Sequence, residues 1–72
     1  MTDPNENLAN AIILQAVKDY RHALKVLRYN PGKSTALITK KECEVFFRSA
    51  WYRTLTTVNG EMLISKLQKE VT

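Results

Sequence analysis

Residues 13–27, ILQAVKDYRHALKVL, decide the fold of this chain. Their apolar side chains recur at intervals of four and three residues, which is the spacing of one face of a helix. That face consists of Ile13, Val17, Tyr20, Leu24 and Leu27. Asp3-Pro4 ahead of it is a good helix opening, and Asn30-Pro31-Gly32 behind it disfavours further helix. The pattern predicts a helix over about 4–29.

A second helix is expected after this turn. Ser34 could cap its start, or Thr39 could, in a capping-box pattern with Glu42. One apolar face then contains Cys43, Phe46, Phe47, Ala50 and Trp51. The helix should bend near Ser49, or fray or end among the threonines of 54–57, so we place its end at about 56. Trp51 is expected in the core, where its replacement by Ala would cost about 3–5 kcal/mol.

A third helix is expected over about 60–71. Asn59-Gly60 is a turn signal with Asn59 as a plausible N-cap, and an apolar stripe follows at Leu63, Ile64, Leu67 and Val71. A β-hairpin across 54–62 is the alternative, because Asn-Gly favours tight hairpin turns. Strict alternation is missing there, so helix is favoured. The predicted fold is all-α: a compact three-helix domain with helices about 4–29, 34/39–56 and 60–71, short loops, and a single domain over 1–72.

Composition excludes several classes of protein. The chain has 72 residues and one cysteine, so no disulfide forms within it, and a reduced cytoplasmic protein is expected. No apolar run approaches the ~20 residues that span a bilayer, and we expect no membrane association. His22 and Cys43 offer at most two ligands where structural zinc needs four, and there is no glycine-rich phosphate loop. We expect no enzyme, no catalytic residues, no metal and no cofactor.

The central part of the chain is strongly basic. Of the eleven Lys and Arg residues, nine lie within 18–53, and the formal net charge is +4. Lys18, Arg21, Lys25 and Arg28 recur at helical spacing beside the apolar face and can follow a phosphate backbone. The alternative is that these four residues form an ordinary solvated helix face that binds nothing. The leading hypothesis is nucleic-acid binding through these four residues, supplemented by Lys33, Lys40 and Lys41.

A second strip lies on the outer side of the second helix. It consists of Lys41, Val45, Arg48 and Tyr52, and Glu44 is placed to pair with Arg48. Arginine and tyrosine are favoured at protein interfaces. An inhibitor or adaptor that contacts a host protein through Tyr29, Val45, Arg48 and Tyr52 is therefore the alternative. A structural homodimer that buries Leu14, Val26 and Val45 is the third hypothesis.

The chain also resembles a known group of sequences. The likeness covers about residues 8–71 and rests on AIILQAVKDYR (11–21), ECEVFFRSAWY (42–52), Leu55-Thr56 and NGEMLI (59–64). These are similar to short uncharacterised proteins encoded by bacteriophages and integrated mobile elements of Firmicutes. No activity is established for that group, so the resemblance assigns no functional residue. It implies a small accessory protein of a mobile element, a class that includes DNA-binding regulators and inhibitors of host enzymes such as anti-CRISPR proteins.

Overall fold

The computed structural model describes residues 4–71, with side chains from residue 8 onward. It contains four helices: α1 (Pro4–Tyr29), α2 (Ser34–Phe47), α3 (Ala50–Leu55) and α4 (Gly60–Val71). The prediction of an all-α domain is confirmed, as are the bounds of the first and last helices. No strand forms within 4–71, so the hairpin alternative over 54–62 is wrong. The part of the chain that the structure describes contains no helix with both the length and the apolar character that a membrane span requires.

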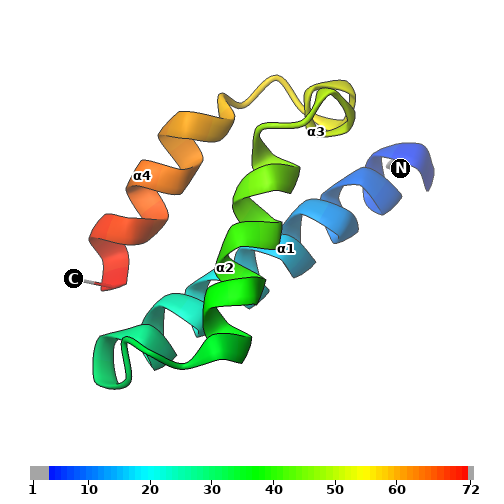
Figure 1. Ribbon diagram of the computed structural model, residues 1–72. Coiled ribbons are helices and arrows are strands. Elements are labelled where there is room, and N and C mark those ends of the chain that lie inside the picture. Colours follow the sequence, from blue (N-terminus) through cyan, green and yellow to red (C-terminus); the bar gives the residue numbers. More distant parts are fainter. Residues whose placement is uncertain (1–3, 72) are drawn as a thin grey trace.

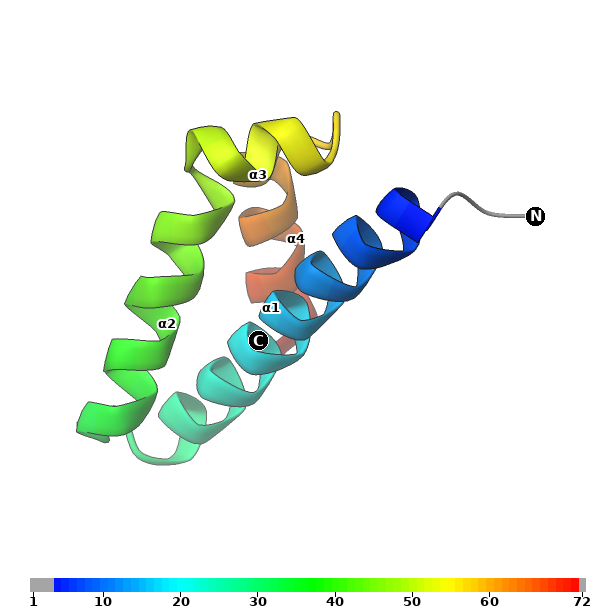
Figure 2. The same cartoon turned by 90° about the vertical axis from the view of Figure 1, so that its right-hand side faces the viewer.

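The long helix α1 organises the molecule. Its 26 residues correspond to about 39 Å of helix, close to the longest dimension of the molecule, 42 Å. After the turn at 30–33, α2 runs back and diverges from α1, as Figure 2 shows. The short helix α3 lies across the open end of this pair, and α4 packs against α1 and α2 on one side (Figures 1 and 2).

The core lies where α1, α2 and α4 meet, with α3 closing it at one end. Its buried members come from all four helices: Val17, Tyr20, Cys43, Phe47, Tyr52, Ile64 and Leu67. Partly buried side chains, among them Ile13, Leu24, Phe46 and Leu63, pack against these residues. The apolar faces predicted for α1 and α4 therefore supply the core, because burying such a stripe is the main stabilisation available to an amphipathic helix.

Two caps fix the helix boundaries in the second half of the chain. The Oδ1 atom of Asn59 accepts a hydrogen bond from the backbone N–H of Met62 at 3.1 Å, which confirms Asn59 as an N-cap. The other cap is Ser49, whose Oγ accepts from the N–H of Tyr52 at 3.1 Å and donates to the carbonyl of Phe46 at 2.6 Å. Ser49 therefore ends α2 and starts α3 as separate helices.

The cap at Ser49 corrects the prediction of one helix up to residue 56. The bend expected near Ser49 is a full break, so the domain has four helices rather than three. The capping box of Thr39 with Glu42 is also wrong, because α2 begins at Ser34 and the Thr39 hydroxyl donates to the carbonyl of Thr35 inside the helix. Ser34 does not cap α2 either; its N-cap is Lys33, which makes no side-chain capping bond. The predicted cap at Asp3 lies outside the described residues.

The break also exchanges the environments of two neighbouring rings. Tyr52 is 1% exposed, whereas Trp51 is 56% exposed. A continuous helix would turn Trp51 toward the core and Tyr52 outward, as the spacing from Cys43 predicts. Because α3 starts anew at Ser49 with a different axis, Tyr52 points inward and contacts Phe47 with ring centroids 5.8 Å apart. The placement of Trp51 in the core and of Tyr52 on an exposed strip is therefore wrong.

Candidate binding surfaces

The basic stripe of α1, defined as Lys18, Arg21, Lys25 and Arg28, lies at the surface. Two of its members are held by α4. Arg21 Nε donates to Glu70 Oε2 at 2.9 Å, and Arg28 Nη1 donates to the carbonyl of Val71 at 2.9 Å. The second contact places a cation at the C-terminus of α4, where the helix dipole favours it. Half of the predicted phosphate-binding stripe therefore takes part in fastening α4 to α1.

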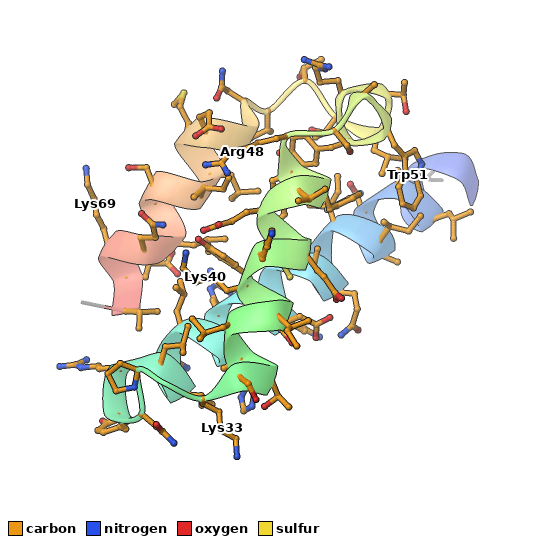
Figure 3. The ribbon with its side chains drawn as sticks, viewed as in Figure 1. Lys33, Lys40, Arg48, Trp51 and Lys69 are labelled. Carbon is orange, nitrogen blue, oxygen red and sulfur yellow. The ribbon has the colours of Figure 1, made fainter. Side chains whose placement is uncertain are left out.

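The supplementary lysines do not extend this stripe into one surface. Lys33 lies at the end of the α1–α2 turn, and Lys40 lies between α2 and α4 (Figure 3). The Nζ atom of Lys40 is 2.8 Å from Glu44 Oε2. Lys41 is exposed and is turned by about 100° from Lys40 around the helix. The structure thus divides the seven predicted cations among several faces of the molecule.

The predicted protein-contact strip on α2 is retained only in part. Val45 is 60% exposed, and Tyr29 at the end of α1 is 85% exposed. Arg48 is also exposed, but it pairs with Glu61 of α4 rather than with Glu44. Tyr52, the fourth member, is buried and offers no surface to a partner. On α2, Arg48 and Val45 are exposed without Tyr52, and Tyr29 on α1 is the exposed aromatic residue of the predicted contact set.

Glu44 is engaged inside the molecule and links three helices. Its Oε2 accepts from the hydroxyl of buried Tyr20 at 2.6 Å and from Lys40, and Gln68 of α4 donates to the same hydroxyl at 3.1 Å. Burial alone would raise the pKa of Glu44, but the hydrogen bonds from Lys40 and Tyr20 lower it below its ordinary value. Burial and the bond to Glu44 raise the pKa of Tyr20 to about 12. This cluster holds the helices together and occupies the Glu44 carboxylate within the molecule.

The apolar positions assigned to a homodimer differ in exposure and lie on two helices. Leu14 is 57% exposed and Val45 is 60% exposed, whereas Val26 is half-buried. Leu14 and Val26 are separated by about 120° around α1, since each residue turns the helix by about 100°. Val45 lies on another helix. A dimer that buries all three is therefore not favoured by their placement.

A shallow apolar groove, here called the Trp51 groove, lies where α1, α2 and α3 meet. Its volume is about 370 Å³, and its lining residues are Ile12, Gln15, Ala16, Asp19, Glu42, Cys43, Phe46 and Trp51. The indole of Trp51 rests edge-on against Phe46, with ring centroids 5.3 Å apart. Figure 3 shows Trp51 at the α3 end of the molecule, away from Lys33. The groove combines an exposed aromatic ring with an apolar floor, which is the composition of protein-binding sites.

The charges at this groove differ from those of the rest of the surface. Asp19 of α1 and Glu42 of α2 are exposed and form no ion pair. Asp19 accepts one hydrogen bond, from Gln15 at 3.0 Å. The other acids among the described side chains, Glu44, Glu61 and Glu70, are each paired with a cation. The two unpaired carboxylates of the described chain therefore both lie at the Trp51 groove.

Neither Cys43 nor His22 belongs to a catalytic or metal-binding cluster among the described side chains. Burial, together with smaller contributions from nearby Asp19, Glu42 and Glu44, raises the pKa of the Cys43 thiol to about 11. A thiol is nucleophilic only as the thiolate, so this environment disfavours reactivity. His22 is exposed. Among the side chains of residues 8–71, no three His, Cys, Asp or Glu gather as a metal site requires.

Sequence reasoning missed the Trp51 groove because it assigned Trp51 to the core. The available signal was Ser49, a strong N-cap residue immediately before Ala50-Trp51-Tyr52, which marks a possible new helix start. Comparisons with known proteins add no further candidate: no family model matches the chain, and neither a curated protein nor a solved structure matches it significantly.

Proposed function

We propose that this chain is a small non-enzymatic accessory protein that binds a host protein, as an inhibitor or adaptor, through the Trp51 groove. The observation that carries the proposal is the 56% exposure of the only tryptophan, seated on an apolar groove. Covering the exposed half of an indole, of order 100 Å², is worth about 2–3 kcal/mol. This free energy becomes available only when another molecule covers the ring.

The surroundings of Trp51 suit the role of a docking anchor. The edge-on contact with Phe46 and the Ser49 cap hold the ring and its helix in place, so little rotamer freedom remains to be lost on binding. Anchors of this kind supply a large share of the affinity at protein interfaces. The sequence resemblance implies an accessory role in a phage or mobile element, and we include that role in the proposal.

The test compares Trp51→Ala with Met62→Ala. Met62 is 71% exposed on α4 and does not line the groove. Because Trp51 is exposed, we expect its replacement to change the free energy of unfolding by only about 1 kcal/mol or less, instead of the 3–5 kcal/mol expected for a core ring. Circular dichroism and urea titration measure this difference.

Binding is measured by affinity capture from nuclease-treated host lysate. Wild type and Met62→Ala should retain the same host protein, and Trp51→Ala should lose it. Equal retention by all three proteins, or retention by none, would contradict the proposed docking site.

Nucleic-acid binding by the basic stripe of α1 is the second candidate function. It is favoured by Lys18 and Lys25, which are exposed and form no ion pair, and by Arg28, whose partner is a neutral carbonyl. With three phosphate contacts, log affinity should fall with log salt at a slope of about −3. Fluorescence anisotropy with DNA and RNA oligonucleotides measures it: Lys18→Gln/Lys25→Gln should weaken binding, and the charge-matched control Arg53→Gln/Lys66→Gln, at exposed positions outside the stripe, should not. Absence of binding at ~50 mM salt would reject this candidate.

A further inference from the structure

We infer that the segment bound by the Trp51 groove is an amphipathic helix that carries lysine or arginine beside its apolar face. The inference rests on the proposed function, because it names the chemistry of the partner at the same site. It follows from three features: the shape of the groove, the charges at its edges, and the poor fit of other occupants.

The shape of the groove favours a helical segment. It is lined by residues of α1 and α2 and by Trp51 of α3, the short helix that lies across the open end of the α1–α2 pair (Figure 2). Recognition of an extended strand needs an exposed sheet edge, and the described chain has no strand. An amphipathic helix instead lays apolar side chains at i, i+3, i+4 and i+7 into a groove. Ile12, Ala16, Phe46 and Trp51 provide the apolar surface for such a stripe.

The charges at the edges select a basic helix. Asp19 comes from α1 and Glu42 from α2, so one unpaired carboxylate belongs to each of the two long helices that form the groove. The protein has a net charge of +4 and cations to spare, and yet no described cation pairs with either carboxylate. A bound helix with cations flanking its apolar stripe would supply the missing partners. Such complementarity contributes more to selection of the partner than to raw affinity.

The same carboxylates disfavour three other occupants. A second copy docked groove to groove about a two-fold axis would set Asp19 and Glu42 against an identical lining, whose charged side chains are the same two carboxylates and include no cation. Like charges brought together at an interface are unfavourable. A nucleic-acid backbone or an anionic lipid surface would be repelled for the same reason. A basic protein segment is the occupant that both the apolar floor and the acidic edges accept.

The experiment uses a displayed library of 16-residue helical peptides. Leucine is fixed along one stripe, and the flanking positions are varied among Lys, Glu, Gln and Ser. Binders selected on the wild-type chain should contain at least threefold more Lys than Glu at the flanking positions. Selection on Asp19→Asn/Glu42→Gln should lose this preference. Glu61→Gln/Glu70→Gln, which changes the net charge equally but lies outside the groove, should keep it.

Affinity for a selected peptide is measured through the emission of Trp51, which should shift to shorter wavelength when the ring is covered. At ~20 mM salt the Asp19→Asn/Glu42→Gln variant should bind about tenfold more weakly than wild type, and at ~0.5 M salt less than twofold, since exposed ion pairs are screened. The Glu61→Gln/Glu70→Gln control should bind like wild type.

Each contrary result has a distinct meaning. Binders that need Trp51 but show no preference for Lys, or prefer Glu, would overturn the inference and leave the docking site intact. A wild-type dimer in sedimentation that Trp51→Ala abolishes would overturn the inference in favour of a second copy. If no binder is recovered, or if binders survive Trp51→Ala, the proposed docking site fails and the inference fails with it.

Discussion

The hydroxyl of Tyr52 is buried and finds no hydrogen-bond partner among the described residues. Burying an unpaired hydroxyl costs free energy, so Tyr52→Phe should stabilise the protein by about 1 kcal/mol. Tyr20→Phe is the matched comparison, because the Tyr20 hydroxyl bonds Glu44 and Gln68. It should destabilise by about 1–3 kcal/mol. Urea titration of the three proteins tests the contrast, and equal effects of the two substitutions would contradict it.

Glu44 gives the molecule a defined sensitivity to acid. Its pKa in the folded protein is lowered, so the carboxylate contributes stability above its unfolded pKa, about 4.3, and this stability is lost as the pH falls through the lower folded value. We expect Glu44→Gln to flatten the dependence of the free energy of unfolding on pH between about 5 and 3. Glu42→Gln, which removes a carboxylate but no ion pair, is the control. An unchanged slope in Glu44→Gln would contradict the assignment.

At the scale of elements, the end of α2 and the start of α4 approach closely at Gly60. A Cβ atom at this position would clash with the carbonyl oxygen of Phe47, which is backbone and cannot move aside. Position 60 requires glycine because space is limited there. It does not require unusual backbone angles, since no described glycine has a positive φ. Gly60→Ala should therefore destabilise by about 1–3 kcal/mol.

Gly32→Ala provides the control for this prediction. A Cβ atom at Gly32 meets nothing within 4 Å, so the substitution should stabilise by about 0.4–1 kcal/mol through loss of entropy in the unfolded chain. Thermal unfolding followed by circular dichroism measures both variants. A neutral Gly60→Ala would show that the junction between α2 and α4 can relax.

The helices could be predicted from the sequence because each carries its own local signals. The apolar spacing in 13–27, the Asn30-Pro31-Gly32 stop and the Asn59 cap depend on nearby residues only. The orientation of Trp51 and Tyr52 depends on whether Ser49 bends the helix or breaks it. That choice is settled by packing of Tyr52 against Phe46 and Phe47. The Trp51 groove could not be predicted for the same reason.

At the scale of the whole molecule, one chain contains a core to which all four helices contribute. The exposed apolar positions Leu14 and Val45 lie on different helices, and Val26 is half-buried. We therefore expect the melting temperature to be independent of protein concentration between about 5 and 500 μM, since only an obligate assembly gains stability by mass action. Calorimetry at several concentrations measures it. A rise with concentration would support the structural homodimer instead.

The sequence shows which residues are charged, but it does not show which of them form ion pairs in the folded protein. The basic stripe of α1 follows from helical spacing, but the pairing of Arg21 with Glu70 joins residues 49 positions apart. The pairing of Arg48 with Glu61 similarly depends on where α4 packs. Which cations remain available to a partner is therefore a property of the tertiary structure.

The position of α4 has a consequence for the order in which the chain folds. Helices α1 and α2 are joined by a short turn, so their contacts form at little cost in loop-closure entropy. The bonds from Arg21 to Glu70, from Arg28 to Val71 and from Gln68 to Tyr20 each close a loop of more than 40 residues. Contacts between residues so far apart in the sequence form late in folding. Truncating Leu67 should then speed unfolding and leave the folding rate nearly unchanged, with a φ-value near zero.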